Sequence, residues 1–199
     1  MRKIITTTFI TMDGVMQAPG GPDEDKTGGF AYGGWQMSFP RTDMTGSILM
    51  GFMNNPFELL LGKTTYNTFA EHWPKQEGPI AVPFNKTKKY VVSQKSFVPS
   101  WHNSICITGD VASQIKKLKQ EDSPDLWVWG SGNLIQTLLK HHLIDRMHLW
   151  IFPITIGKGK RLFAEGTQAE NFKLVDSKTS PTGVIIATYE PTGDLKTKP

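Results

Sequence analysis

The alternation of short apolar segments with segments of helical periodicity constrains this chain more than any other feature of its sequence. Buried strands are expected where apolar and β-branched residues run together, at residues 57–61, 89–93, 104–108, 126–129 and 147–156. Helices are expected where apolar residues recur at helical spacing, at residues 41–54, 63–73, 110–120 and 133–141. Such alternation predicts parallel strands covered by helices on both faces.

The two ends of the chain complete this predicted sheet. Residues 4–11 form a β-branched and aromatic run that stops at a turn signal, Asp13-Gly14, which predicts the first strand. Residues 172–178 and 184–190 are separated by a short connection that only antiparallel neighbours can use. We therefore predict one three-layer α/β domain over residues 1–199, with a mostly parallel central sheet, an antiparallel C-terminal hairpin and a flexible tail over residues 190–199.

A glycine-rich segment, residues 20–34, interrupts the regular pattern and still carries large rings, Phe30 and Tyr32, with Trp35 just after it. A linker has little reason to hold such rings, so we expect a functional lid. A loop that only completes the core is the alternative.

Composition and charge exclude several classes of protein. The 22 Lys and Arg residues are interspersed with 18 Asp and Glu residues, so the net charge of +4 gives no signal for nucleic acid. The longest apolar run, residues 149–156, is interrupted by Pro153 and falls far short of the roughly 20 residues that cross a bilayer. One cysteine, Cys106, lies inside a strand pattern, and the five histidines lack ligand spacing, so we predict no disulfide and no metal site. The expectation is a soluble cytoplasmic protein without nucleic-acid or membrane partners.

Three predicted strands end in small or hydroxyl residues where the chain turns, in residues 60–65, 91–95 and 129–133. Ligands of open parallel sheets bind beyond the carboxyl ends of the strands, so these turns should face one crevice. Helix starts and glycines suit phosphate groups, and Lys63, Ser93 and Lys95 add donors. The pattern favours a phosphorylated dinucleotide. However, glycines at such turns are also common for steric reasons, and residues 130–135 lack the third glycine of the dinucleotide fingerprint.

Taken in order, these segments resemble the dihydrofolate reductase-like family, and within it the free-standing relatives of the reductase domain of riboflavin biosynthesis. The resemblance covers nearly the whole chain and is carried by residues 11–17 (TMDGVMQ), 61–66 (LGKTTY), 90–93 (YVVS), 130–132 (GSG), 143–146 (LIDR) and 153–163 (PITIGKGKRLF). It implies a dihydrofolate reductase-like fold, reduction by NADPH, a small-molecule substrate and a homodimer.

The resemblance also implies roles for individual residues. The cofactor would be held by Gly14, Val15, Gly62, Lys63, Thr64, Thr65, Ser93, Gln94, Lys95, Gly130, Ser131, Gly132, Asn133 and Leu134. Asp13 and Asp43 are the candidate catalytic carboxylates, and Gln17 and Trp35 are expected at the substrate. Lysine stands at position 63 where the family usually has arginine, which leaves NADH possible as an alternative cofactor.

We therefore predict an NADPH-dependent oxidoreductase that transfers a hydride to a small heteroaromatic or carbonyl compound, resembling pyrimidine or dihydrofolate reductases. Because the sequence shows no unambiguous proton donor, a nucleotide- or flavin-binding module without turnover is an alternative. A third hypothesis is a dimeric scaffold in which residues 149–156 form the subunit contact. The zinc deaminase signature is absent from the chain.

Overall fold

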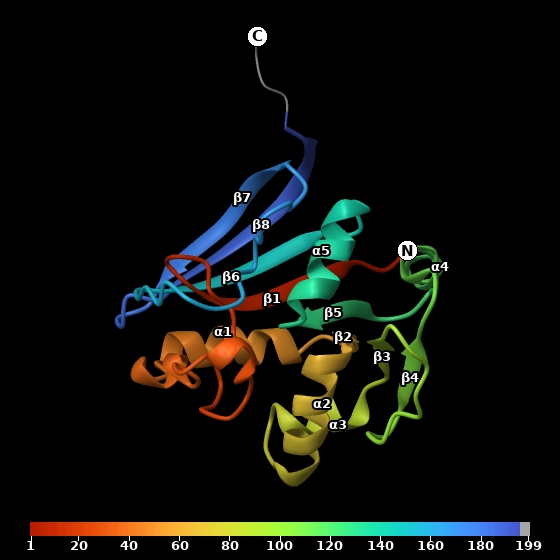
Figure 1. The fold of residues 1–199 in the computed structure, drawn as a ribbon, viewed down its shortest axis with the longest axis horizontal. Helices are drawn as coiled ribbons and strands as arrows, with labels where there is room; N and C mark the ends of the chain where they lie inside the picture. The colour runs from red at the N-terminus through yellow and green to blue at the C-terminus, as the bar shows by residue number, and fades with distance from the viewer. Residues whose placement is uncertain (196–199) are drawn as a thin grey trace.

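The computed structural model describes residues 1–195. Its strands are β1 (Ile4–Thr11), β2 (Phe57–Gly62), β3 (Lys89–Val92), β4 (Ser104–Ile107), β5 (Asp125–Trp129), β6 (Arg146–Phe152), β7 (Glu170–Thr179) and β8 (Ile185–Asp194). Its helices are α1 (Asp43–Met53), α2 (Lys63–His72), α3 (Ala81–Lys86), α4 (Val111–Lys119) and α5 (Gly132–Lys140), and three short 3₁₀ turns lie at Thr27–Gly29, Trp35–Ser38 and Trp73–Lys75. Figure 1 shows their arrangement.

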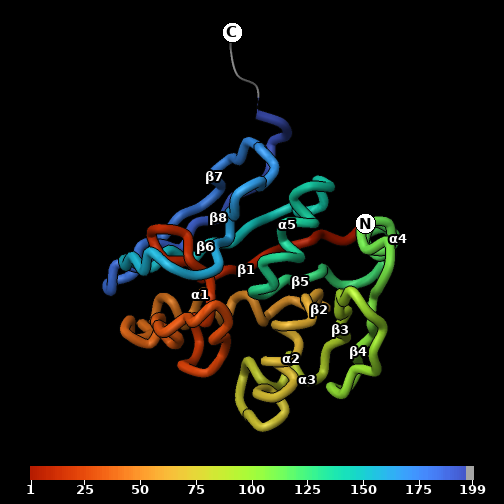
Figure 2. Tube along the Cα trace, in the orientation of Figure 1, coloured from red at the N-terminus to blue at the C-terminus, as the bar shows by residue number. Residues whose placement is uncertain are grey.

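All eight strands form one sheet in the order β4-β3-β2-β5-β1-β6-β8-β7. The six strands from β4 to β6 in this order are parallel, whereas β8 runs antiparallel to β6 and β7 antiparallel to β8. This confirms the predicted sheet with its antiparallel C-terminal hairpin. The hairpin projects from the end of the sheet opposite β4 (Figure 2). As a result, the carboxyl ends of the six parallel strands share one edge.

Helices cover both faces of the sheet, as the sequence predicts. On one face Ile115 of α4 and Leu138 of α5 pack with Ile4 and Leu126 of the strands. The opposite face is covered by α1, α2 and α3, whose apolar side chains belong to two further clusters. Figure 1 shows α5 above the central strands and α1 and α2 below them. The apolar periodicity that predicts α5 is therefore its buried stripe, because it faces the sheet.

No helix within residues 1–195 has the length and apolar character needed to span a bilayer.

Strand β6 is shorter than predicted and lies inside the molecule. It ends at Phe152 because Pro153 has no N–H to donate to the sheet. Its two edges pair with β1 and β8, and Leu149 and Trp150 are buried. The predicted strand over residues 153–156 is therefore wrong, and a subunit contact formed by residues 149–156 stays a prediction.

Two further predictions need correction. The sequence predicts no helix or strand over residues 81–86, yet these residues form α3. This helix has six residues and is too short to show a full apolar period. The predicted flexible tail is wrong for residues 190–194, because β8 pairs with β7 as far as Asp194. The last four residues of that tail, 196–199, lie outside the described part of the chain.

His148 is a buried titratable group in the centre of the sheet. Its Nδ1 lies 3.0 Å from Thr188 Oγ1, and its ring lies 4.6 Å from the Phe52 ring. Burial, with a smaller contribution from Arg146, lowers the pKa of His148 from 6.5 to about 4. The folded state therefore keeps this imidazole neutral at pH values where the unfolded chain is protonated.

We expect the free energy of unfolding to fall as the pH drops from 6.5 toward 4, since the unfolded state then binds the additional proton. This group should contribute about 2 kcal/mol of the loss between pH 7.5 and pH 5. Urea unfolding at the two pH values checks it. His148→Gln should remove that part of the pH dependence, whereas His102→Gln, at an exposed position, should leave it unchanged. Equal pH dependence in wild type and His148→Gln would contradict the assignment.

Candidate active site

A cleft of about 2090 Å³ follows the carboxyl edge of the parallel strands. The ends of β2, β3 and β5 reach it at Gly62, Ser93 and Gly130. These strands are neighbours in the sheet and run parallel, so their ends lie side by side. The three turns that the sequence singled out therefore line one crevice.

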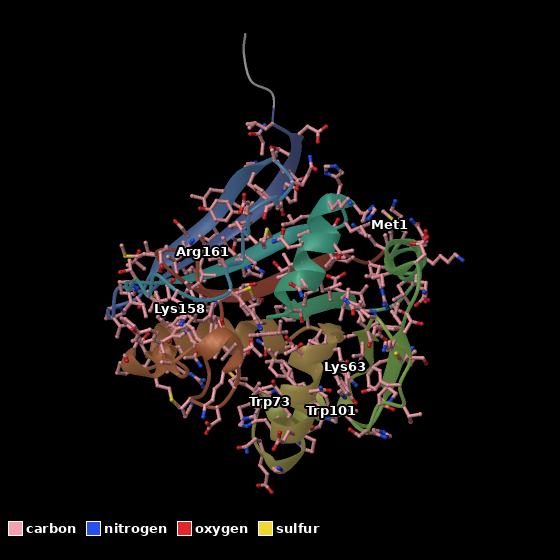
Figure 3. The ribbon with its side chains drawn as sticks, viewed as in Figure 1. Met1, Lys63, Trp73, Trp101, Lys158 and Arg161 are labelled. Atoms are coloured by element: carbon pink, nitrogen blue, oxygen red, sulfur yellow. The ribbon has the colours of Figure 1, made fainter. Side chains whose placement is uncertain are left out.

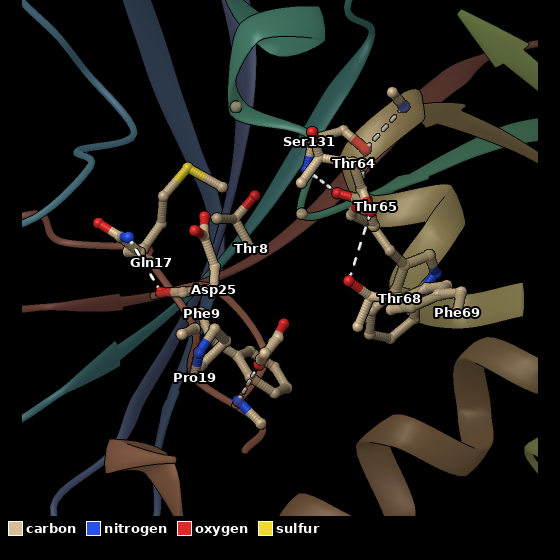
Figure 4. Close-up of a pocket in the computed structure, with 18 of the residues that line it drawn as sticks. Thr8, Phe9, Gln17, Pro19, Asp25, Thr64, Thr65, Thr68, Phe69 and Ser131 are labelled. Atoms are coloured by element: carbon tan, nitrogen blue, oxygen red, sulfur yellow. Dashed lines mark hydrogen bonds between the residues drawn. The ribbon is translucent and has the colours of Figure 1, made fainter. Parts of the chain in front are cut away.

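Hydrogen bonds tie the β2 turn to the β5 turn. The Gly62 N–H donates to Ser131 Oγ at 3.0 Å, and the Ser131 N–H donates to Thr65 Oγ1 at 3.0 Å. Ser131 adopts a left-handed conformation, with φ 58° and ψ 44°, and Gly130 before it has φ 54°. Figure 4 shows the bond between Thr65 and Ser131 at the top of the cleft wall. Glycine suits position 130 because L side chains rarely adopt this backbone conformation.

Helices α2 and α5 start at this wall without a side-chain cap. Both also lack an acidic residue in the first turn. By contrast, α1 is capped by Thr42 and α4 by Asp110. The first amides of a helix have no partner within it, so α2 and α5 present free N–H groups and a partial positive charge. Such a pair of helix starts can bind an anion.

Other predicted cofactor residues surround these helix starts. The lining includes Lys63, Thr64, Thr65, Ser93, Gln94, Lys95, Gly132, Asn133 and Leu134. Lys63 places its ammonium group over the Phe97 ring, which orients the charge without neutralising it. In Figure 3, Lys63 lies beside α2, well apart from Lys158 and Arg161 beside the hairpin end of the sheet. The cations near the helix starts are therefore distinct from those of residues 158–161.

The segment after β1 forms the opposite wall of the cleft. Figure 4 shows Thr8, Phe9, Gln17, Pro19 and Asp25 facing Thr64, Thr65, Thr68 and Phe69 of α2. Gln17 is buried and fixes this segment, because its Nε2 donates to the carbonyls of Asp25 and Thr27 and its Oε1 accepts from the Lys160 N–H at 3.0 Å. Gln17 thus lines the cleft and fixes the position of the segment that forms its wall. Its contact with substrate stays a prediction.

One part of the glycine-rich segment lines the cleft and another part is buried in the core, so the segment does more than complete the core, and a lid function stays a prediction. Residues 19–25 line the cleft, whereas Phe30 and Trp35 are buried against the aromatic cluster around Phe152. Trp35 donates its Nε1 hydrogen to the Gln17 carbonyl at 2.8 Å and packs edge-on against Phe152. Trp35 lies outside the lining, so its predicted contact with substrate is indirect at most: it supports Gln17.

Asp13 and its neighbours also lie outside the cleft lining. The Asp13 carboxylate accepts hydrogen bonds from Thr11 Oγ1 at 2.5 Å and from the Ile156 and Gly157 N–H groups. The bond from Thr11, together with the backbone bonds, lowers its pKa to about 2. Gly14 and Val15 continue this turn, which bonds to residues 161–162. These three residues connect β1 to the segment after β6.

Asp43, the second candidate carboxylate, lies in the first turn of α1 and is exposed. It is absent from the cleft lining, so the structure places it at a helix N-terminus and away from the cleft.

Four acidic residues outside the predicted set line the cleft, and two of them, Glu24 and Asp25, are partly buried. Asp25 pairs with Lys160 at 2.6 Å and accepts from Thr27, and these contacts lower its pKa despite burial. Burial raises the pKa of Glu24, and its Oε2 accepts from the Gly20 N–H at 2.6 Å. The acidic run Asp23-Glu24-Asp25 was visible in the sequence, but only the fold shows which of its side chains are enclosed.

Several buried polar atoms at the cleft lack a hydrogen-bond partner among the described residues. They are Thr8 Oγ1, Trp73 Nε1, Trp129 Nε1 and Trp150 Nε1. A buried donor without a partner costs free energy, and such atoms next to a cleft are available to a ligand. The apolar part of the lining near them is aromatic, with Phe9, Phe39 and Phe152. This region fits a flat ring system with hydrogen-bond acceptors.

Residues 1–195 contain no cluster of three or more His, Cys, Asp or Glu side chains able to hold a metal ion.

Comparisons with known proteins agree with this geometry. A model of the RibD C-terminal domain matches residues 2–186. The chain is 27% identical over 193 residues to the protein YyaP of Bacillus subtilis (strain 168), covering 94% of each chain. A shorter match, 31% identical over 62 residues, relates it to YwjB of the same organism, over 31% of this chain and 36% of that protein.

Two solved structures share the fold. One is a Shewanella sp. PV-4 protein assigned to riboflavin biosynthesis, with a TM-score of 0.71, 23% identity and coverage of 96% of this chain and 99% of that chain. The other is a pyrimidine reductase-like protein of Corynebacterium diphtheriae, with a TM-score of 0.66, 13% identity and coverage of 97% and 93%. The resemblance stated from the sequence motifs is confirmed.

The tie between the two turns leads to a prediction about stability. Thr65→Val removes the acceptor of the buried Ser131 N–H and should lower the free energy of unfolding by about 1–2 kcal/mol. Thr64→Val is the matched control, because it makes the same change at an exposed position one residue earlier and should cost less than about 0.5 kcal/mol. Urea unfolding measures both. Equal losses in the two variants would show that the Thr65 hydrogen bond does not contribute to the free energy of unfolding.

Proposed function

Because the chain belongs to the family of RibD C-terminal domains, we propose that it is a reductase that binds NADPH along the carboxyl edge of its sheet and reduces a small heteroaromatic or carbonyl compound. The observation that carries the proposal is the alignment of the β2, β3 and β5 turns on one cleft, with two uncapped helix starts facing it.

The uncapped helix starts suit the pyrophosphate of a dinucleotide. The first amides of α2 and α5 supply N–H donors, and the Ser131 bonds hold the two helix starts together. A Cβ at position 132 would lie 2.9 Å from Met16 Sδ, so the close packing of Met16 at the start of α5 favours glycine here.

The residues after β3 suit the adenosine 2′-phosphate. Ser93, Gln94 and Lys95 line the cleft beside Lys63, and their hydroxyl, amide and ammonium groups are hydrogen-bond donors for phosphate oxygens. We propose NADPH as the preferred cofactor on this basis. NADH is the alternative, because a lysine at position 63 binds a phosphate as a point charge and without the bidentate geometry of arginine.

The aromatic end of the cleft suits the substrate. The cofactor, when bound, supplies a hydride. The side chains of Phe9, Phe39 and Phe152 exclude water there and position a flat substrate. The pyrimidine reductase-like neighbour makes a pyrimidine one substrate class to test, together with pterins and quinones.

Gly132→Asp should abolish NADPH binding, because a carboxylate at the start of α5 occupies and repels the pyrophosphate position. Titration followed by NADPH fluorescence measures the dissociation constant. Gly51→Asp is the control: it introduces the same side chain within α1, at a glycine whose Cβ would meet open space. Wild-type protein that fails to bind NADPH at micromolar concentration would refute the proposed function. Binding without oxidation across the substrate panel would favour a binding module.

Lys95→Gln should weaken NADPH binding by about tenfold, because one charge-assisted phosphate contact is lost. NADH, which lacks the 2′-phosphate, should bind the variant as it binds wild type. The same fluorescence titration with both cofactors gives the ratio. Lys116→Gln, on the exposed surface of α4, is the control for a lost lysine charge. An equal loss of affinity for NADPH and NADH in Lys95→Gln would show that Lys95 does not contact the 2′-phosphate.

A further inference from the structure

Reduction of a carbonyl or of a carbon–nitrogen double bond needs a proton in addition to a hydride. Four carboxyl groups line the cleft, those of Asp23, Glu24, Asp25 and Glu71. Asp23 forms an ion pair with Lys26, and both side chains are exposed. The last, Glu71, is also exposed. Neither of these two side chains is enclosed by the cleft.

Asp25 is enclosed but already paired. Its Oδ2 lies 2.6 Å from Lys160 Nζ, and its Oδ1 accepts from the Thr27 hydroxyl at 2.6 Å and from the Thr27 N–H at 3.0 Å. These bonds favour its ionised form, so it is held as an anion. Its role is to fix the wall of the cleft.

Glu24 differs from the other three in combining enclosure with the lack of a cationic partner in the described chain. It is half-buried and lines the cleft, and its Oε2 accepts a hydrogen bond from the Gly20 N–H at 2.6 Å. Backbone hydrogen bonding from Gly20 and Gly21 acts against the effect of burial on its pKa. The charged groups that act on Glu24 are Asp25, which disfavours ionisation, and His72, which favours it. Burial is the largest effect and raises the Glu24 pKa.

The backbone beside Glu24 is held in place. Gln17 Nε2 donates to the Asp25 carbonyl at 3.1 Å, and the Glu24 N–H donates to the Gly21 carbonyl at 3.3 Å. A group that transfers a proton must be positioned within hydrogen-bond reach of its acceptor, and these contacts restrict the loop that carries the carboxyl group.

We propose that Glu24 is the catalytic acid of this cleft and donates a proton to the nitrogen or oxygen atom of the bond being reduced. The inference rests on the proposed function. The hydride of the reduced nicotinamide bonds to the substrate carbon, and the π electron pair moves to the heteroatom. The Glu24 O–H bond breaks as the heteroatom takes the proton, and the carboxylate regains a proton from solvent. The substrate gains two electrons and the nicotinamide loses them.

Turnover of a dihydropterin, a 5-aminouracil and a naphthoquinone with NADPH provides the first test. Glu24→Gln should lower kcat by at least about 100-fold for any compound that wild type reduces, and should leave the NADPH dissociation constant within twofold. Glu24→Asp should recover part of the rate. In wild type, kcat should fall as the pH rises through the pKa of Glu24, because only the protonated acid can donate. Glu77→Gln, an exposed position absent from the lining, is the control for a lost carboxylate. Full activity in Glu24→Gln would overturn the proposal.

A second measurement needs no substrate. In protein labelled with ¹³C at the glutamate carboxyl carbon and saturated with NADPH, the resonance missing from Glu24→Gln should titrate above the ordinary pKa of glutamate. Titration at or below that value would overturn the proposal even if no compound of the panel is reduced. Failure of wild type to bind NADPH would instead refute the proposed function, so the two failures are distinguishable.

Discussion

The bonds of Ser131 are the constraint on which the cleft depends. Its N–H donates to Thr65 Oγ1 and its hydroxyl accepts from the Gly62 N–H. Ser131, in the turn after β5, thus fixes both the end of β2 and the first turn of α2. Because Ser131 can do this only in a left-handed conformation, the turn costs conformational energy that the two bonds offset. The two helix starts are held beside each other as a result.

A second set of contacts fixes the opposite wall. Gln17 connects the segment after β1 to the segment after β6, because it bonds to Asp25, Thr27 and the Lys160 N–H. Lys160 adds an ion pair to Asp25. The two contacts of Lys160, with Gln17 and with Asp25, join residues separated by more than a hundred positions in the chain. Glu24, which lies between the bonded residues, is left with a carboxyl group that faces the cleft.

The two ends of the cleft therefore differ in chemistry. One end has helix N-termini, hydroxyl groups and the ammonium groups of Lys63 and Lys95, which together favour anionic phosphate. The other end has aromatic rings, indole N–H groups without partners among residues 1–195, and two enclosed carboxyl groups, of which Asp25 is paired with Lys160 and Glu24 has no cationic partner in that range. A long ligand with phosphates at one end and a flat ring at the other matches this division. The proposed reductase would need both a site for its cofactor and a dry site for the substrate ring, and this division of the cleft supports that proposal.

Local pattern in the sequence was sufficient to predict most of the fold. Local periodicity and turn chemistry predict the strand over residues 4–11, the apolar stripes of α4 and α5, and the turns at Gly62, Ser93 and Gly130. The sequence could not decide which side chains face the cleft, since that depends on contacts between distant segments. Asp13 and Trp35 bond to other parts of the chain and lie outside the lining, and Glu24 enters it because Gln17 and Lys160 hold its loop. Spacing along the chain determines secondary structure, whereas burial and bonding across the chain determine which carboxyl group has its pKa raised.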